Sequence, residues 1–228
     1  MKRLAEVELP DLDGYFDRWS GLHGGYDPRR GFWPRTWLTF AYHCALPLAR
    51  RDVAPDALTV AGMAVSGAVA LVAGLGGRWP LLGVAIVVAA GLLDNLDGAV
   101  AALTRRATSF GYVFDSVADR VSDGCYVVAL WLLGAPGWLC VLGGLVTMFH
   151  EFVRSEATGA GMVDVVVVTV AERPTRVIVA AFTLLSAGAV PAYAHVCATT
   201  GAAVWLAMGA VGFVQLVSAV QRFLRADR

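Results

Sequence analysis

Charged side chains are scarce in this sequence. Asp, Glu, Lys and Arg make up 16% of its 228 residues, whereas 57% of the residues are hydrophobic. Ordinary soluble proteins are about one quarter charged, so the composition excludes a soluble globular domain, a disordered chain and a collagen-like fibre. The 18 basic residues are balanced by 18 acidic ones. This zero net charge argues against a nucleic-acid-binding protein, whose binding surface is basic.

Cysteine is also rare, and its placement excludes two kinds of site. The four cysteines are far apart in the chain: Cys44, Cys125, Cys140 and Cys197. Without a C-x-x-C pair they indicate neither a zinc site nor a disulfide framework. Residues 1–35 do not resemble a secretory signal peptide, because they are polar and interrupted by glycine and proline. We therefore expect residues 1–35 to form a cytosolic N-terminal segment.

Apolar stretches make up most of the remaining chain. In residues 36–51, large apolar side chains recur at three-to-four spacing before Arg50 and Arg51. This pattern predicts an amphipathic helix on the membrane surface or, alternatively, an ordinary helix packed on the bundle. Six longer stretches follow, of about the length that spans a bilayer: 57–77, 79–103, 110–134, 136–155, 174–194 and 200–221. We expect an all-α integral membrane protein with an interfacial juxtamembrane helix at 36–51, a six-helix transmembrane catalytic domain at 57–222 and a cytosolic tail at 223–228.

The distribution of basic residues indicates an orientation in the membrane. If the six spans alternate in direction, Arg78 is the single basic residue on one side of the membrane. The other side carries both termini and the remaining Lys and Arg. Cytosolic loops are enriched in these residues, so we predict a multi-pass protein of the plasma (inner) membrane with both termini in the cytosol. Acidic residues follow the same distribution, which predicts a cytosolic active site.

Four aspartates interrupt two consecutive apolar stretches. Asp94 and Asp97 close the second stretch, and Asp115 and Asp119 open the third, so each pair lies on one face of its helix. At about 1.5 Å per residue, the pairs reach matching depths in an antiparallel hairpin. Ionised carboxylates need partners there, and two Mg²⁺ or Mn²⁺ ions with oxygen ligands fit this need and suit phosphoryl transfer. A proton relay and solvation at the helix ends are the alternatives.

Small residues accompany the aspartates. Gly98, Ala101 and Gly111 allow close approach of a bulky anionic ligand or, alternatively, close helix packing. The whole run DNLDGAVAALTRRATSFGYVFDSVAD, residues 94–119, resembles the signature of the CDP-alcohol phosphotransferase family, D-x-x-D-G-x-x-A-R-x8-G-x-x-x-D-x-x-x-D. One position differs, because Ala102 stands where the family has arginine.

This resemblance implies roles for individual residues. It implies that Asp94, Asp97 and Asp115 are metal ligands, and that Asp119 is the general base and also touches the second metal. The segment APDALT, ending at Thr59, is similar to the family's P-N-x-L-T and is expected to help hold the cytidine. The implied CDP-binding set is Asp56, Thr59, Gly98, Ala101, Arg105, Arg106 and Gly111. We hypothesise that Arg105 or Arg106 replaces the arginine missing at Ala102, provided that the helix continues that far.

A second similarity concerns the acceptor. HEFVRSEA at 150–157 and VAERPTR at 170–176 are similar to segments of actinobacterial members that use phosphorylated polyols, such as phosphatidylinositol-phosphate synthases. The similarity implies a cationic pocket for an acceptor phosphate, formed by Arg154, Arg173 and Arg176. The alternative is that these arginines only mark cytosolic helix ends. Glu151 and Glu156 stand where those members have serine and arginine, which counts against an inositol-phosphate acceptor.

Taken together, the resemblance implies a divalent-metal-dependent membrane phosphotransferase of phospholipid biosynthesis that forms a homodimer. An alcohol acceptor, such as a phosphorylated polyol, would attack the β-phosphorus of a CDP-linked lipid such as CDP-diacylglycerol and release CMP. Two other classes also place carboxylates in membrane helices. A membrane prenyltransferase would need a second aspartate-rich motif, and a cation or proton transporter would place its carboxylates nearer the midplane.

Overall fold

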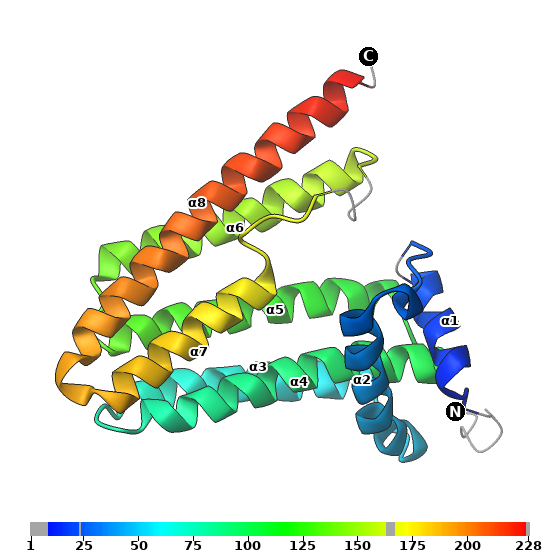
Figure 1. Ribbon diagram of the computed structural model, residues 1–228, viewed down its shortest axis with the longest axis horizontal. Coiled ribbons are helices and arrows are strands. Elements are labelled where there is room, and N and C mark those ends of the chain that lie inside the picture. Colours follow the sequence, from blue (N-terminus) through cyan, green and yellow to red (C-terminus); the bar gives the residue numbers. More distant parts are fainter. Residues whose placement is uncertain (1–8, 23, 163–166, 227–228) are drawn as a thin grey trace. The chain divides into compact units, whose positions relative to one another are not determined.

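The computed structural model describes residues 9–22, 24–162 and 167–226, and these residues form helices and no strand. Figure 1 shows the elements in chain order. They are α1 (Leu12–Leu22), η2 (Pro28–Arg30), α2 (Phe32–Arg50), α3 (Pro55–Gly74), α4 (Pro80–Thr104), α5 (Ser109–Leu132), α6 (Gly137–Gly159), α7 (Arg173–Ala189), η4 (Pro191–Tyr193) and α8 (Ala194–Ala226). The chain divides into two compact units. The first unit comprises Met1–Ala64 and Ala89–Asp119, and the second comprises Val65–Val88 and Arg120–Arg228.

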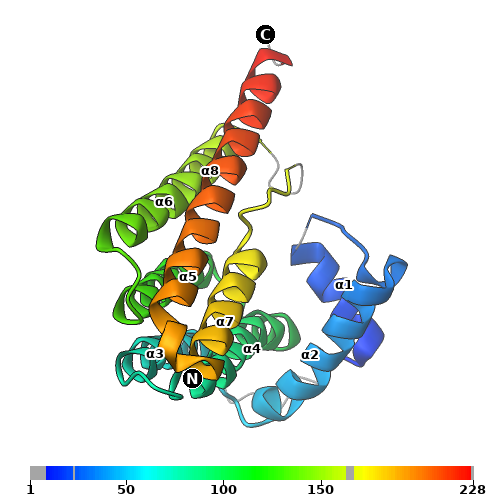
Figure 2. The same ribbon diagram turned by 60° about the vertical axis from the view of Figure 1, so that its left-hand side comes forward.

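The first unit is built on the apolar faces of α1, α2 and the C-terminal part of α4. Tyr15 and Phe16 of α1 and Tyr42 of α2 are buried in one cluster with Leu96 and Leu103 of α4. Both views show α1 beside α2 (Figure 2). Burial of these aromatic side chains is a strong source of stability, because each removes a large apolar area from water. The core therefore fixes the end of α4 that carries the signature.

Helix α1 was not expected from the sequence, because glycine and proline around it suggested an irregular segment. Its apolar residues nevertheless follow a helical pattern, with Leu12, Tyr15, Phe16 and Trp19 at three-to-four spacing. The side chain of Arg18 lies on the same helix and donates a hydrogen bond of 2.6 Å to the carbonyl oxygen of Leu103. This contact satisfies one of the carbonyls left without an intrahelical partner at the end of α4.

Two helices of the first unit end in the same way. Asp52 follows α2 and Arg105 follows α4, and both have left-handed backbone conformations, with φ of 59° and 55°. The amide of the next residue then bonds back into the helix: Val53 to Leu48 O at 3.1 Å, and Arg106 to Ala101 O at 3.0 Å. These are Schellman ends, in which glycine is the usual left-handed residue.

Helices α6, α7 and α8 pack together in the second unit, and α6 and α8 lie side by side in both views (Figures 1 and 2). Close packing depends on glycine in α8. A Cβ added to Gly201 would lie 2.1 Å from the hydroxyl oxygen of Thr183 in α7. On α6, the hydroxyl of Thr147 accepts a hydrogen bond of 3.0 Å from the indole of Trp205 in α8. The core of this unit is therefore closely packed and contains a satisfied polar contact.

Each of the six predicted apolar stretches corresponds to one helix from α3 to α8, although the ends differ by one to six residues. The surface helix expected at 36–51 begins earlier, at Phe32, and ends at Arg50. By length and composition, three helices in the described part of the chain can cross a membrane: Pro55–Gly74, Pro80–Thr104 and Pro191–Arg225. Helices α5 and α6 carry several charged residues, and α7 has only 17 residues.

Candidate active site

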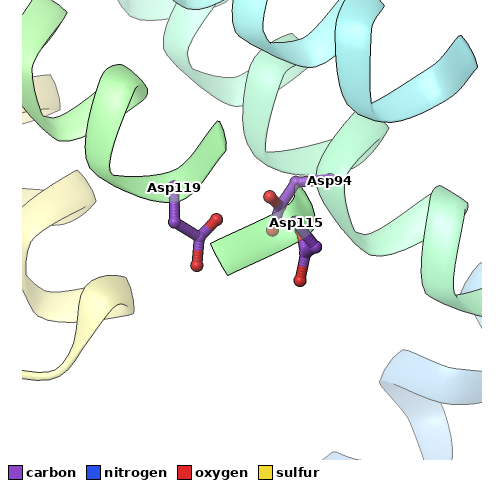
Figure 3. A group of neighbouring side chains, drawn as sticks. All are labelled: Asp94, Asp115 and Asp119. Atoms are coloured by element: carbon purple, nitrogen blue, oxygen red, sulfur yellow. The ribbon is translucent and has the colours of Figure 1, made fainter. Parts of the chain in front are cut away.

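Three aspartates of the signature converge in the first unit. Asp94 lies on α4, and Asp115 and Asp119 lie on the first turns of α5. One carboxylate oxygen from each lies within 4.8 Å of the others, and Figure 3 shows the three side chains directed toward a common region. All three are half-buried. The spacing of the signature therefore brings carboxylates from two helices together, as predicted from the shared faces.

Asp97 has a different environment from the other three aspartates. Its side chain is buried, with Oδ2 accepting a hydrogen bond of 2.6 Å from the hydroxyl of Thr59 and Oδ1 accepting one of 2.6 Å from the amide of Gly98. Thr59 lies on α3, so three helices contribute to the candidate site. Thr59, which the sequence predicted as a contact of the cytidine, thus contacts one of the signature aspartates. Of the four predicted metal ligands, three therefore have carboxylates that converge, whereas the carboxylate of the fourth, Asp97, is held by hydrogen bonds from Thr59 and Gly98.

The other residues expected near the nucleotide lie in the same unit. A Cβ added to Gly111 would lie 3.5 Å from Oδ1 of Asp56, so the carboxylate of Asp56 is beside the start of α5. A Cβ added to Gly98 would meet nothing within 4 Å, and Gly98 is exposed, whereas Ala101 is half-buried. The open space beside Gly98 is consistent with ligand approach along α4.

The hypothesis that α4 continues past Ala102 onto the two arginines is wrong. The helix ends at Thr104, and the left-handed conformation of Arg105 turns the chain away from the helical path. Arg105 is exposed, whereas Arg106 pairs with Asp52 at 2.6 Å. Ala102 itself is buried in the apolar core of the first unit. No residue of the helix therefore restores a guanidinium on the face of Ala102.

The three arginines expected at the acceptor site lie in the second unit, and Arg176 is the most buried of them. Its guanidinium forms an ion pair with Oδ2 of Asp123 at 2.9 Å and donates a hydrogen bond of 3.0 Å to Oε1 of Glu151. It also donates to the carbonyl of Ala171. Glu151 accepts a second hydrogen bond of 2.9 Å, from Arg120. Arg176 is thus held by two carboxylates from two different helices.

Arg154 is paired in a similar way. It donates to the carboxylate of Glu172 and, at 3.2 Å, to the carbonyl of Val167. Glu172 also accepts hydrogen bonds from the amide of Thr169 at 2.8 Å and from its hydroxyl at 3.0 Å. The ring of His150 contacts that hydroxyl at 3.0 Å. The segment before α7 is therefore tied to α6 by a continuous polar network.

Glu151 and Glu172 were missed as partners of the arginines. The sequence offered a signal, since a glutamate lies within a few residues of an arginine in both HEFVR and AERPTR. Such closeness indicates ion pairing but does not identify which side chains meet. Arg120 on α5 also pairs with Glu151, at 2.9 Å.

The donor atoms of the first unit determine what it can bind. Asp94, Asp115 and Asp119 offer only carboxylate oxygens, and hard divalent cations such as Mg²⁺ and Mn²⁺ prefer oxygen ligands. A cation also relieves the repulsion between carboxylates brought so close together. The residues present therefore fit a divalent metal centre.

Comparison with known proteins places this geometry in a family. Residues 52–221 match the family described as CDP-alcohol phosphatidyltransferase. The chain is 36% identical over 135 residues to the archaetidylinositol phosphate synthase of Methanothermobacter thermautotrophicus, covering 58% of this chain and 67% of that protein. It is 33% identical over 149 residues to the phosphatidylinositol phosphate synthase of Mycobacteroides abscessus, covering 59% and 63%. The chain thus spans about two thirds or less of the length of the curated relatives it matches.

The fold is also similar to that of solved structures. The phosphatidylinositol phosphate synthase of Mycobacterium tuberculosis, crystallised with manganese and citrate, matches with a TM-score of 0.63 and 24% identity, covering 79% of this chain and 88% of that one. A structure of the same protein with CDP-DAG bound matches with a TM-score of 0.60, covering 77% and 92%. The helical arrangement is therefore shared with these structures.

Proposed function

Because this chain belongs to the CDP-alcohol phosphatidyltransferase family, we propose that it transfers a phosphatidyl group from a CDP-linked lipid such as CDP-diacylglycerol to an alcohol, releasing CMP. The convergence of Asp94, Asp115 and Asp119 carries this proposal. The relatives named as synthases of phosphorylated inositol lipids and the similar structure with bound CDP-DAG support it. They favour the transferase over the prenyltransferase and transporter alternatives.

We assign the metal site to Asp94, Asp97, Asp115 and Asp119, which would hold two Mg²⁺ or Mn²⁺ ions. The manganese in the similar crystal structure supports the choice of metal. When bound, divalent ions neutralise the charge of the diphosphate and of the leaving group. Asp97 contributes with its orientation fixed by Thr59 and Gly98. The chain thereby positions four carboxylates before any substrate arrives, so little reorganisation accompanies binding.

Asp119 is proposed as the general base. Its carboxylate takes the proton of the acceptor hydroxyl while that oxygen forms a bond to the β-phosphorus of the donor. The bond between the β-phosphorus and the bridging oxygen then breaks, and its electron pair leaves with CMP. We propose that the CDP portion binds beside Asp56, Thr59, Gly98, Ala101 and Gly111, with Arg105 and Arg106 nearby. Arg154, Arg173 and Arg176 are proposed to face the acceptor.

We propose that α2 lies on the membrane surface and that α3 to α8 form six spans. Trp33, Trp37 and Phe40 are exposed on one face of α2, whereas Leu38 and Tyr42 are buried on another. Indoles favour the interface between lipid and water, which supports this placement.

The proposed segments are 1–35 (cytosolic), 36–51 (interfacial), 57–222 (transmembrane) and 223–228 (cytosolic). The protein is proposed to lie in the inner membrane with its active site on the cytosolic side. Residues 1–8, 23, 163–166 and 227–228 of these segments lie outside the described residues. The family resemblance further supports a homodimer.

The decisive experiment supplies the purified protein with CDP-diacylglycerol, Mg²⁺ or Mn²⁺, and a panel of hydroxyl acceptors. CMP and a new phospholipid should appear together by mass spectrometry, and only when donor, metal and acceptor are all present. Asp115→Asn should abolish both products without loss of the folded protein. Consumption of a prenyl diphosphate, or metal flux into vesicles without CMP release, would instead support one of the alternative classes.

A further inference from the structure

Two arginines at the end of α4 have no carboxylate partner among the described residues of the first unit. Arg18 of α1 is half-buried and donates its hydrogen bond of 2.6 Å to the carbonyl oxygen of Leu103. Arg105 is exposed and directly follows α4. Burial, and after it the positive charge of Arg105, lower the pKa of the Arg18 guanidinium. The two guanidinium groups are therefore neighbours, and Arg18 has further N–H donors beyond the one that Leu103 accepts.

Acidic residues of α1 and of the end of α2 pair with other arginines. Asp13 and Asp17 of α1 contact Arg29 at 4.0 and 2.7 Å. Asp52, which follows α2, contacts Arg106 at 2.6 Å. The carbonyl groups at the end of α4 offset only part of the remaining positive charge, because a helix C-terminus amounts to about half an elementary charge. The end of α4 is thus suited to attract an anion.

The backbone of Arg105 supports a role for its side chain. Its φ of 55° is left-handed, at a helix end where glycine is the usual residue. Asp52 is the other non-glycine residue of the described chain with a positive φ, and its side chain pairs with Arg106. An unfavourable backbone conformation that persists at a residue points to a function of that residue. The described residues offer no carboxylate partner to Arg105, which leaves a ligand as its partner.

Arg18 lies near the position where the signature lacks its arginine. Ala102 is buried in the core of the first unit together with Tyr15 of α1, so α1 helps to cover the site from which an arginine at 102 would extend. Arg18 lies on the same helix and reaches the carbonyl of Leu103, one residue beyond Ala102. Leu103 is about 9 Å along α4 from Asp97, at about 1.5 Å per residue. A nucleotide with its phosphates near the aspartates can extend over that distance.

We propose, as a refinement that rests on the proposed function, that Arg18 takes the place of the signature arginine and, together with Arg105, binds the phosphate that leaves with CMP. Guanidinium groups bind phosphate oxygens through charge-assisted, often paired hydrogen bonds. The contact with Leu103 holds one N–H of Arg18 and thereby orients the others. Helix α1, which precedes the proposed transmembrane domain, thus contributes to donor binding as well as to the core.

The test measures the binding of CMP and of cytidine to the purified full-length protein by calorimetry, with Mg²⁺ in a neutral detergent. Cytidine has the base and ribose of CMP but lacks the phosphate. Arg18→Gln keeps a donor for Leu103 and removes the charge, so the Kd of CMP should rise about tenfold or more, whereas the Kd of cytidine should change less than twofold. Arg105→Gln alters an exposed position and should weaken CMP in the same way, even if Arg18→Gln folds poorly.

Arg35→Gln is the matched control, because it removes an exposed arginine from α2 in the same unit. It should leave both dissociation constants within twofold. An equal loss of CMP and cytidine affinity in Arg18→Gln, or an unchanged CMP constant in either folded variant, would overturn the role of this pair. If the two variants lose affinity for phosphatidylglycerol and keep their affinity for CMP, the pair binds a lipid headgroup and the proposal is wrong.

The same preparations distinguish failure of this inference from failure of the proposed function. If Arg18 and Arg105 have no part in nucleotide binding, the wild type still releases CMP from CDP-diacylglycerol when an acceptor is present. Absence of CMP with every hydroxyl acceptor would contradict the proposed function itself.

Discussion

Thr59 and Asp97 are joined by a buried hydrogen bond of 2.6 Å between α3 and α4. The second carboxylate oxygen of Asp97 accepts from the amide of Gly98, so both oxygens are engaged and the carboxylate has one orientation. Partners of this kind set the direction in which a metal-binding carboxylate points. A threonine that resembled a nucleotide contact in the sequence is thus also a positioning residue for a proposed metal ligand.

Replacing Thr59 with valine is expected to weaken metal binding. The substitution keeps the side-chain shape but leaves Asp97 without its hydroxyl donor, and loss of such a partner typically reduces metal affinity about 10- to 100-fold. The apparent Mg²⁺ constant for CMP release should rise accordingly, and Thr59→Ser should restore it. An unchanged Mg²⁺ constant in Thr59→Val would show that the hydrogen bond does not orient a metal ligand.

Asp119→Asn separates proton transfer from metal binding. A positioned general base contributes about 100- to 10,000-fold to a rate, so turnover should fall at least within that range, whereas Mn²⁺ affinity, measured by calorimetry, should fall less than in Asp94→Asn, because Asp119 is proposed to touch only the second ion. Asp94→Asn is the matched comparison and should lose Mn²⁺ affinity and turnover together. If Asp119→Asn releases CMP at the wild-type rate, its assignment as the base is wrong, whereas loss of Mn²⁺ affinity would make it chiefly a ligand.

The two arginines that follow α4 should differ in their contribution to donor binding. Arg105 is exposed, whereas Arg106 is engaged by Asp52. Arg105→Ala is therefore expected to raise the KM for CDP-diacylglycerol more than Arg106→Ala does, by roughly the tenfold that corresponds to a charge-assisted hydrogen bond. Steady-state kinetics with the donor varied would measure both values. Undiminished turnover and unchanged KM in both variants would remove these arginines from the nucleotide site.

Tyr15 predicts a pH dependence of stability in the first unit. Its hydroxyl is buried without a hydrogen-bond partner among the described residues, and burial raises the pKa of Tyr15 from 10.0 to about 12. The folded state thus holds the phenolic proton more tightly than the unfolded state. The resulting stability is present below pH 10 and is lost as the pH rises from 10 to 12.

Tyr15→Phe should abolish that alkaline loss of stability. At pH 7 it should be neutral or stabilising by about 1 kcal/mol, because it removes an unsatisfied buried hydroxyl. Urea unfolding followed by tryptophan fluorescence at pH 7 and pH 11 would measure both effects. A parallel decline of the two proteins between these pH values would mean that another group titrates.

The sequence was sufficient to predict the helices that carry the site, because long apolar stretches separated by turn residues rarely form anything other than helices. It did not predict α1, since Gly14 and Gly21 concealed the apolar face of Tyr15 and Phe16. Helix ends were also approximate. The end of α4 depends on the left-handed conformation of Arg105. A glycine at this position would have predicted a helix end, whereas an arginine does not.

The candidate site was predictable to the extent that helical spacing fixes which side chains share a face. Asp115 and Asp119 had to point together, and their proximity to Asp94 followed from an antiparallel hairpin. The different environment of Asp97 and the counter-ion role of Glu151 were not predictable. Both depend on side chains from helices distant in sequence, and spacing within a single helix contains no information about them.

The connection between α4 and α5 is only four residues long, from Arg105 to Thr108. Each residue of a helix advances the side-chain direction by about 100°. The number of residues between this turn and Asp115 therefore determines whether Asp115 and Asp119 point toward Asp94. Deleting a single residue between Ser109 and Asp115 would rotate both carboxylates out of the cluster without changing the composition or hydrophobicity of the helix. Length variation should therefore be absent from the first two turns of α5, in keeping with the fixed spacing of the signature that runs through this turn.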